Sequence, residues 1–204
     1  MTRYANESVP KRRAPFRAAW LPLLASLLIG ATGTCVAAGA QPVGAASSLS
    51  GPNLERSVKA AYLFKFLGYV EFPAATDPAA ALVVGVMAAD DVAAEVTRLT
   101  SGRSVNGRPV AVRTLRDGDS TAGLQMLFVG AATERPVQTL RSAAQNGVLT
   151  VTDDENGLQQ GAIINFRLVE DRIRFEVSLP AAERSNLKLS SRLLSVAYHV
   201  QKGN

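Results

Sequence analysis

The chain has 204 residues, with 22 Lys and Arg against 17 Asp and Glu and a formal net charge of +5. The basic excess lies in the first forty residues, which hold five of the basic and one of the acidic side chains, so the remainder is nearly neutral. This balance lacks the electrostatic footprint of a nucleic-acid-binding protein, and the remaining length suits one domain with a substantial core.

The first forty residues contain the three parts of a secretory signal peptide. A basic cluster over 11–17 precedes an apolar run over 18–29, and residues 38–40 read Ala-Gly-Ala, like a cleavage site. The run is shorter than the ~20 residues that span a bilayer. We therefore expect a signal peptide over 1–40, a periplasmic location and no membrane insertion after cleavage. An uncleaved N-terminal anchor is the alternative.

The only cysteine, Cys35, lies within this leader. The exported chain would therefore form no disulfide and offer no thiolate ligand or nucleophile. Residues 41–52 are rich in Gly, Ala, Ser and Pro, which predicts a flexible linker, and the folded domain is expected over 53–201.

Helical and strand patterns alternate through the first part of this domain. Asn53 is a candidate N-cap for a helix that runs to about Leu67, and Asp90-Asp91 can cap a second helix over about 92–99. A third helix is expected from about Thr133 to Gln145. Between them, apolar runs predict buried strands over 82–87, 110–115, 124–129 and 148–152. This order favours a partly parallel sheet with helices on both faces.

The C-terminal part has a different pattern. Residues 162–169 and 172–179 flank Glu170-Asp171 as the two arms of a hairpin, and the second arm alternates strictly between apolar and polar side chains. A last helix is expected from Ser190 or Ser191, with His199 at its fraying end. The predicted fold is a single α/β domain with a mixed, mostly parallel sheet of about six strands and a C-terminal antiparallel hairpin.

Few residues could support catalysis. His199 is the only histidine, five residues from the C-terminus, and no nucleophile elbow or phosphate-binding glycine pattern is present. The stretch 152–157 resembles part of a calcium loop, but its alignment lacks the first aspartate and the last glutamate. We expect no enzyme activity, no catalytic residue, no metal and no cofactor. A hydrolase that uses carboxylates alone is the alternative.

Lys65 is the one unusual residue inside the first helix, because it falls among apolar positions on a helical wheel. Such a lysine snorkels along the helix or pairs with a carboxylate such as Glu71. The competing interpretation is a polar lining for a small ligand, formed by Tyr62, Lys65 and Glu71.

Four segments in order resemble the YfiR-like (YfiR/HmsC) family of bacterial periplasmic proteins. They are the helix and Val-Glu-Phe-Pro signature over 58–73, the pieces at 149–153 and 161–166, the strand over 174–179, and residues 187–194. Together they cover essentially all of 54–200. Family members commonly carry cysteine in the strand that matches 124–129, and this chain has none, which puts a redox-sensitive role in doubt.

The resemblance implies a regulator. It implies a protein that represses an inner-membrane diguanylate cyclase, or a similar sensor such as a sensor kinase, by binding its periplasmic domain, with cyclic di-GMP and biofilm formation downstream. An outer-membrane lipoprotein as a second partner and a homodimer are also implied. We expect the partner contacts on the loop and hairpin over 158–166, at Leu158, Ile163, Ile164 and Phe166. The alternative function is a periplasmic small-ligand sensor or binding protein, with its site beyond the strand ends.

Overall fold

The computed structural model describes residues 51–72 and 79–203. The expected leader over 1–40 and all of the expected linker except Gly51 and Pro52 lie outside these residues. The described helices are α1 (Pro52–Phe66), α2 (Asp90–Thr100), α3 (Pro136–Gln145), α4 (Leu179–Arg184) and α5 (Ser191–Val196). The strands are β1 (Val70–Glu71), β2 (Leu82–Met87), β3 (Ser104–Val105), β4 (Arg108–Leu115), β5 (Met126–Val129), β6 (Leu149–Thr152), β7 (Ile164–Val169), β8 (Arg172–Ser178), β9 (Lys188–Leu189) and β10 (His199–Gln201). Within the described ranges, no helix has the length and apolar character needed to cross a bilayer.

Eight strands form the main sheet, in the order β10-β8-β7-β6-β5-β2-β4-β3. All neighbours are parallel except the β7–β8 hairpin and the β3–β4 pair. The short strands β1 and β9 pair separately as an antiparallel ribbon. The predicted α/β class, with a mostly parallel sheet and a C-terminal hairpin, is confirmed. The sheet is wider than the expected six strands because β3 and β10 extend its two edges.

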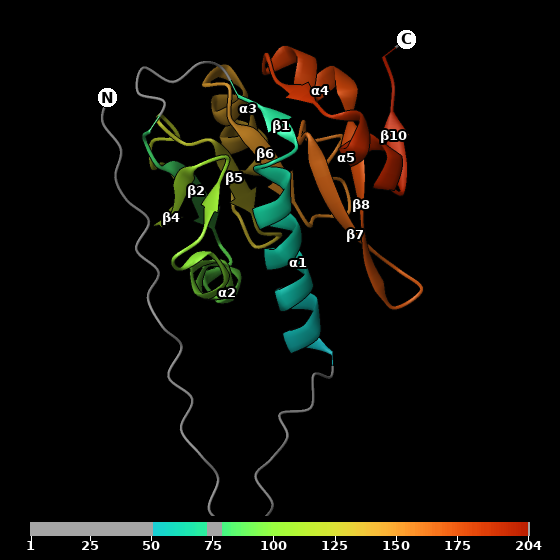
Figure 1. Ribbon diagram of the computed structural model, residues 1–204. Helices are drawn as coiled ribbons and strands as arrows, with labels where there is room; N and C mark the ends of the chain where they lie inside the picture. Colours follow the sequence, from blue (N-terminus) through green and yellow to red (C-terminus); the bar gives the residue numbers. More distant parts are fainter. Residues whose placement is uncertain (1–50, 73–78, 204) are drawn as a thin grey trace, which may run out of the picture. The chain divides into compact units, whose positions relative to one another are not determined.

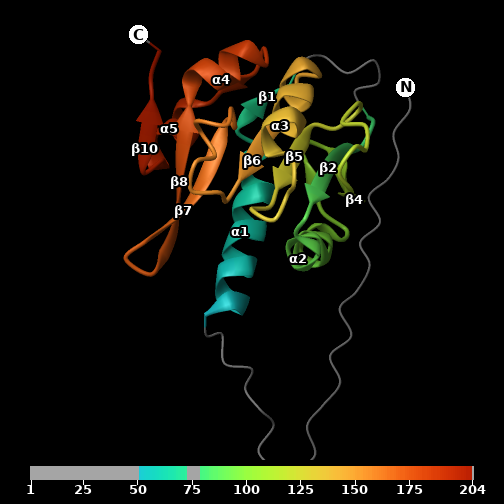
Figure 2. The same ribbon diagram turned by 180° about the vertical axis from the view of Figure 1, so that it is seen from behind.

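Helices cover both faces of this sheet, as Figures 1 and 2 show from opposite sides. Helices α1 and α2 share one buried cluster with side chains such as Val84, Val86 and Phe128. Helix α3 packs against a second cluster with Leu127 and Val129. Successive side chains of a strand point to opposite faces, so the apolar runs β2 and β5 supply both clusters. This explains why these strands are apolar at every position.

The first two helices begin earlier than their expected caps. Helix α1 starts at Pro52 with Gly51 as its N-cap, and Asn53 lies inside the helix. Proline is suited to the first helical position because its missing N–H would have no partner there. Helix α2 starts at Asp90 with Ala89 as N-cap, so the two aspartates lie in the first turn and do not cap it. Their charges still favour the positive end of the helix.

In the C-terminal segment, the predicted N-cap is confirmed but the predicted extent of the helix is wrong. The Ser190 hydroxyl accepts a hydrogen bond from the Leu193 amide at 3.3 Å, as expected for an N-cap. Helix α5 ends at Val196, however, and His199 lies in β10, paired in parallel with Glu176 of β8. The prediction of a fraying helix end was wrong. The outer edge of β8 has backbone groups that need partners, and β10 supplies them.

Candidate functional site

The carboxyl ends of β2, β5 and β6 meet at one edge of the sheet, and α1 packs beside them. Strands β2 and β5 are parallel neighbours. Strand β2 leads to α2, on the α1 face, whereas β5 leads to α3 on the opposite face. Two adjacent strands whose connections leave to opposite faces form a topological switch point, where open α/β sheets bind ligands.

The connections at this switch point consist of small residues that pack closely. The Gly130 amide donates a hydrogen bond to the Met87 carbonyl at 2.9 Å. A Cβ atom at Gly130 would lie 2.5 Å from the Ala88 carbonyl oxygen, so only glycine fits there. Ala88 itself has a φ of 53°, which is unfavourable for a residue with a Cβ atom. Backbone strain of this kind concentrates at binding and catalytic sites.

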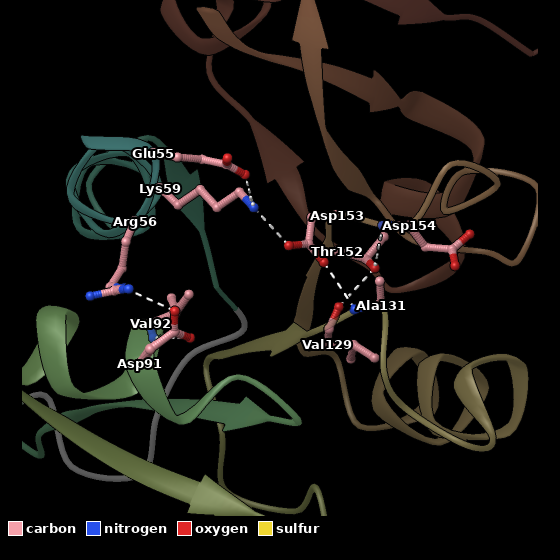
Figure 3. Close-up of polar contacts among 10 residues, drawn as sticks. All are labelled: Glu55, Arg56, Lys59, Asp91, Val92, Val129, Ala131, Thr152, Asp153 and Asp154. Atoms are coloured by element: carbon pink, nitrogen blue, oxygen red, sulfur yellow. Dashed lines mark hydrogen bonds and ion pairs between the residues drawn. The ribbon is translucent and has the colours of Figure 1, made fainter. Parts of the chain in front are cut away.

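The Lys59 side chain of α1 extends to this edge and, through Asp153, links the helix to the segments that follow β6 and β5 (Figure 3). Its Nζ atom lies 2.7 Å from Oε1 of Glu55, one turn earlier, and 2.8 Å from Oδ2 of Asp153, which follows β6. The other oxygen of Asp153 accepts a hydrogen bond from the Ala131 amide, beyond β5, at 3.0 Å. Only 11% of the Lys59 side chain is exposed, so this ammonium is a largely buried charge held by two carboxylates.

The surroundings of Lys59 act on its pKa in opposite directions. Burial lowers the pKa because it disfavours the charged ammonium, while the hydrogen bonds to Asp153 and Glu55 favour that form. The carboxylates prevail, and the net pKa of Lys59 lies above its ordinary value of 10.5. Lys59 therefore remains an ammonium at neutral pH and is not available as a nucleophile or base.

A second ion pair joins α1 to α2 beside the first (Figure 3). Nε of Arg56 lies 2.8 Å from Oδ2 of Asp91, in the first turn of α2. One helical turn along the same interface, the Ser57 hydroxyl donates to Glu95 at 2.8 Å. Both contacts hold the N-terminal half of α1 against α2.

The two ion pairs line one cavity of about 240 Å³. Its remaining walls are the small residues after β2 and β5 and the start of α2. A neighbouring hollow of about 230 Å³ shares Glu55, Lys59 and Asp153 and extends to β7 and β8. In the part of the chain that the structure describes, no three His, Cys, Asp or Glu side chains come together as a metal site. The cavity combines charges of both signs with walls of small residues.

Comparison with protein families identifies the group to which this molecule belongs. The profile of YfiR/HmsC-like proteins matches residues 56–198, from the first half of α1 to the residue before β10. The chain belongs to the YfiR/HmsC-like family. The resemblance expected from the sequence is therefore confirmed. Membership suggests a periplasmic regulator of cyclic di-GMP signalling, since YfiR-like proteins are regulators and not enzymes. No curated protein matches the chain.

This YfiR-like domain buries most of the residues expected to contact a partner. Ile163 and Ile164 are fully buried and Phe166 is nearly so, while Leu158 is half-buried. Phe166 stacks on Phe66 with ring centroids 6.0 Å apart. These side chains form part of the core and offer little surface to a partner. Consecutive residues of this segment are buried, and apolar residues in sequence alone do not distinguish a core strand from an interface.

The three residues expected to line a ligand site do not come together as one. Tyr62 is half-buried in an aromatic cluster and packs edge-on against Phe175 at 5.4 Å. Lys65 is exposed, near the end of α1, and has no ion pair among the described residues. Glu71 is exposed on β1, paired through its backbone with Lys188. The expected pairing of Lys65 with Glu71 is absent.

The buried lysine of α1 is Lys59, six residues before the one that the helical wheel indicated. The spacing of Glu55 and Lys59, four residues apart on a helix, is a detectable ion-pair signal. Asp153, in the stretch that resembles part of a calcium loop, is its second partner. That contact spans 94 residues of sequence, so no local pattern could reveal it.

Proposed function

We propose that this protein is a periplasmic regulator that binds the periplasmic domain of an inner-membrane diguanylate cyclase, or of a similar sensor such as a sensor kinase, and represses it. The leader over 1–40 exports the chain. Binding lowers the synthesis of cyclic di-GMP and with it biofilm formation. Sequestration by an outer-membrane lipoprotein and formation of a homodimer belong to the same proposal.

The observation that carries this proposal is the family match over residues 56–198, which spans nearly all of the described domain. The groups at the switch point are consistent with it. The buried lysine there is held protonated between carboxylates, which suits binding better than chemistry.

An apolar groove supplies the surface on which partner binding can be tested. It measures about 490 Å³ and lies between the start of α1 and the β7–β8 hairpin. Leu168 of β7 is 64% exposed and Leu54 of α1 is 47% exposed, and both line it. Exposed large apolar side chains that gather around one groove are typical of contact surfaces. We infer that the partner contacts this groove, in place of the buried residues 163–166.

The experiment measures cyclic di-GMP in cells that lack the gene and in cells complemented with variants. Deletion should raise cyclic di-GMP, and the wild-type chain should restore the original level. Leu168→Glu should fail to restore it, because a carboxylate cannot be buried against an apolar partner surface. Val137→Glu is the matched control, since Val137 is also an exposed apolar residue (45%) but lies on α3 and not at the groove.

Both variants must be recovered from the periplasm with melting temperatures close to that of the wild type. No change in cyclic di-GMP on deletion would overturn the proposed function. Full repression by Leu168→Glu would instead move the contact surface elsewhere and leave the function itself intact. Crosslinking of the periplasmic protein to the membrane cyclase provides a direct second measurement.

A further inference from the structure

Charged side chains in the cavity at the switch point have hydrogen-bonding groups that their own ion pairs do not use. Arg56 donates through Nε to Asp91 and through Nη1 to Asn53, and its Nη2 atom has no hydrogen bond within the described structure. Each oxygen of Asp153 accepts one hydrogen bond, although a carboxylate can accept about four. A donor and an acceptor of opposite charge therefore line the same cavity of about 240 Å³.

The walls between these groups leave room for a molecule. Ala88, Ala89, Gly130 and Ala131 extend no side chain beyond Cβ. Ala89 gives α2 no N-cap side chain, and Oδ1 of Asp91 accepts a hydrogen bond from the Val92 amide in the first turn at 2.8 Å. The carboxylates of Asp90 and Asp91 offset the partial positive charge of that helix end, so the free Nη2 of Arg56 is the donor that remains for an anionic group. Lys59 and Asp153 lie along the wall formed by α1 and the end of β6.

The charge balance of the cavity selects among ligand classes. Three carboxylates and two cations line it, from Glu55, Asp91, Asp153, Arg56 and Lys59. A simple anion would be attracted by Arg56 but repelled by the carboxylates around it, and a simple amine would meet the opposite conflict. A molecule that carries one charge of each sign can contact Arg56 and Asp153 at once, without leaving a desolvated charge unpaired.

The volume limits the size of that molecule. Cavities that hold drug-sized ligands measure roughly 300–1,000 Å³, so this one accommodates a smaller compound.

We propose that the switch-point cavity binds a small zwitterion with a primary ammonium and a carboxylate, of the class of α-amino acids with short side chains. The carboxylate contacts Nη2 of Arg56, and the ammonium contacts Asp153. Lys59 positions Asp153 for this role by holding its second oxygen. The inference does not depend on the proposed regulatory function, because it concerns the protein alone.

Calorimetric titration and thermal melting of the protein, produced from the full chain and purified from the periplasm, test this proposal. The probe is L-serine, compared with 2-aminoethanol, which lacks the carboxylate, and 3-hydroxypropanoate, which lacks the ammonium. L-Serine should bind and raise the melting temperature, since a ligand of the native state stabilises it. Each single-charge analogue should bind at least about tenfold more weakly than L-serine does.

Two variants separate the site from general effects on the protein. Arg56→Gln removes the guanidinium that contacts the ligand carboxylate and should weaken L-serine binding by about tenfold or more. Its control is Arg98→Gln, which removes an arginine that also pairs with a carboxylate but lies outside the cavity. Ala131→Leu fills the cavity from an exposed position and should abolish binding while the unliganded melting temperature stays near that of the wild type.

The proposal is overturned if L-serine, L-alanine and glycine all fail to bind. It is also overturned if the single-charge analogues bind as well as the zwitterions, or if Ala131→Leu folds and binds as the wild type does. Since cyclic di-GMP is not measured here, a failure of this inference is distinguishable from a failure of the proposed regulatory function.

Discussion

At the scale of single residues, Lys59 is a charged side chain in a largely buried position that requires partners of opposite charge. An isolated ammonium in a largely buried position would be costly, and the two carboxylates at 2.7 and 2.8 Å make the position tolerable. The arrangement is reciprocal, because Asp153 is itself mostly shielded from water and depends on Lys59 for its charge partner. Removal of one member should therefore cost more than an exposed ion pair would.

We expect Lys59→Met to lower the free energy of unfolding by about 1–3 kcal/mol, because it leaves the Asp153 carboxylate half-buried without its cation. Urea unfolding measures the difference. Lys188→Met is the control, since Lys188 is exposed and should change stability by less than about 0.5 kcal/mol. Adding Asp153→Asn to Lys59→Met should cost less than the sum of the two single changes. Equal stability of Lys59→Met and Lys188→Met would contradict this account.

At the scale of elements, the packing of α1 against α2 combines apolar contacts with a polar contact near its centre. Glu95 of α2 accepts from the Ser57 hydroxyl of α1 at 2.8 Å and from Arg98 at 2.7 and 2.9 Å. The hydrogen bonds from Arg98, and then that from Ser57, lower the pKa of Glu95 from 4.5 to about 2. The carboxylate is thus stabilised in the folded state relative to the unfolded chain.

This shift predicts a specific pH dependence. A carboxyl group with a lowered pKa in the folded state stabilises the fold above its unfolded pKa, and that contribution is lost as the pH falls from about 4.5 through about 2. Glu95→Gln should therefore be less stable than the wild type near neutral pH, and the difference should shrink as the pH falls through this range. Thermal melts at a series of pH values measure it.

Glu134→Gln serves as the comparison for the pH series, because Glu134 is exposed and forms no ion pair among the described residues. A constant difference between Glu95→Gln and the wild type across the whole pH range would show that the role of Glu95 does not depend on its charge.

The β7–β8 hairpin forms although its two turn residues are a weak hairpin signal in the sequence. Glu170 and Asp171 have φ values of 49° and 57°, so both central residues of the two-residue turn are left-handed. This is the geometry that matches the twist of the flanking strands, although Asn-Gly adopts it at lower cost. The alternation of the second arm and the six-residue register between the strands determine the pairing despite the unfavourable turn residues.

At the scale of the whole molecule, one sheet connects two apolar clusters. The cluster under α1 and α2 and the cluster under α3 lie on opposite faces of the same strands. Loss of packing on one face therefore destabilises the strands against which the cluster on the other face also packs. We expect the described domain to unfold as one cooperative unit, as small single domains generally do.

Leu140→Ala tests this coupling. Leu140 of α3 is almost fully buried, so its truncation should lower the free energy of unfolding by about 2–5 kcal/mol. Far-ultraviolet circular dichroism and the near-ultraviolet signal of the tyrosines, among them Tyr62 in the aromatic cluster on the other face, should still report a single transition. Val137→Ala, on the exposed side of α3, should change stability little. Loss of the far-ultraviolet signal before the near-ultraviolet tyrosine signal would show that the two faces unfold separately.

The sequence by itself determined the elements whose causes are local. The apolar run of β2, the alternation in β8 and the serine cap of α5 all follow from the periodicity and hydrogen-bonding capacity of neighbouring residues. The family also followed from the sequence, because its signature segments occur in order along the chain.

Only the tertiary structure decided the features that join distant segments. The strands β1 and β9, the parallel pairing of β10 and the contact between Lys59 and Asp153 depend on parts of the chain that folding brings together. It also decided that Ile163 and Ile164 belong to the core and that the charged cavity lies at the switch point. The physical reason is the same in each case: a local pattern predicts a helix, a strand or a buried position, but only the packed fold determines which distant segment each residue meets.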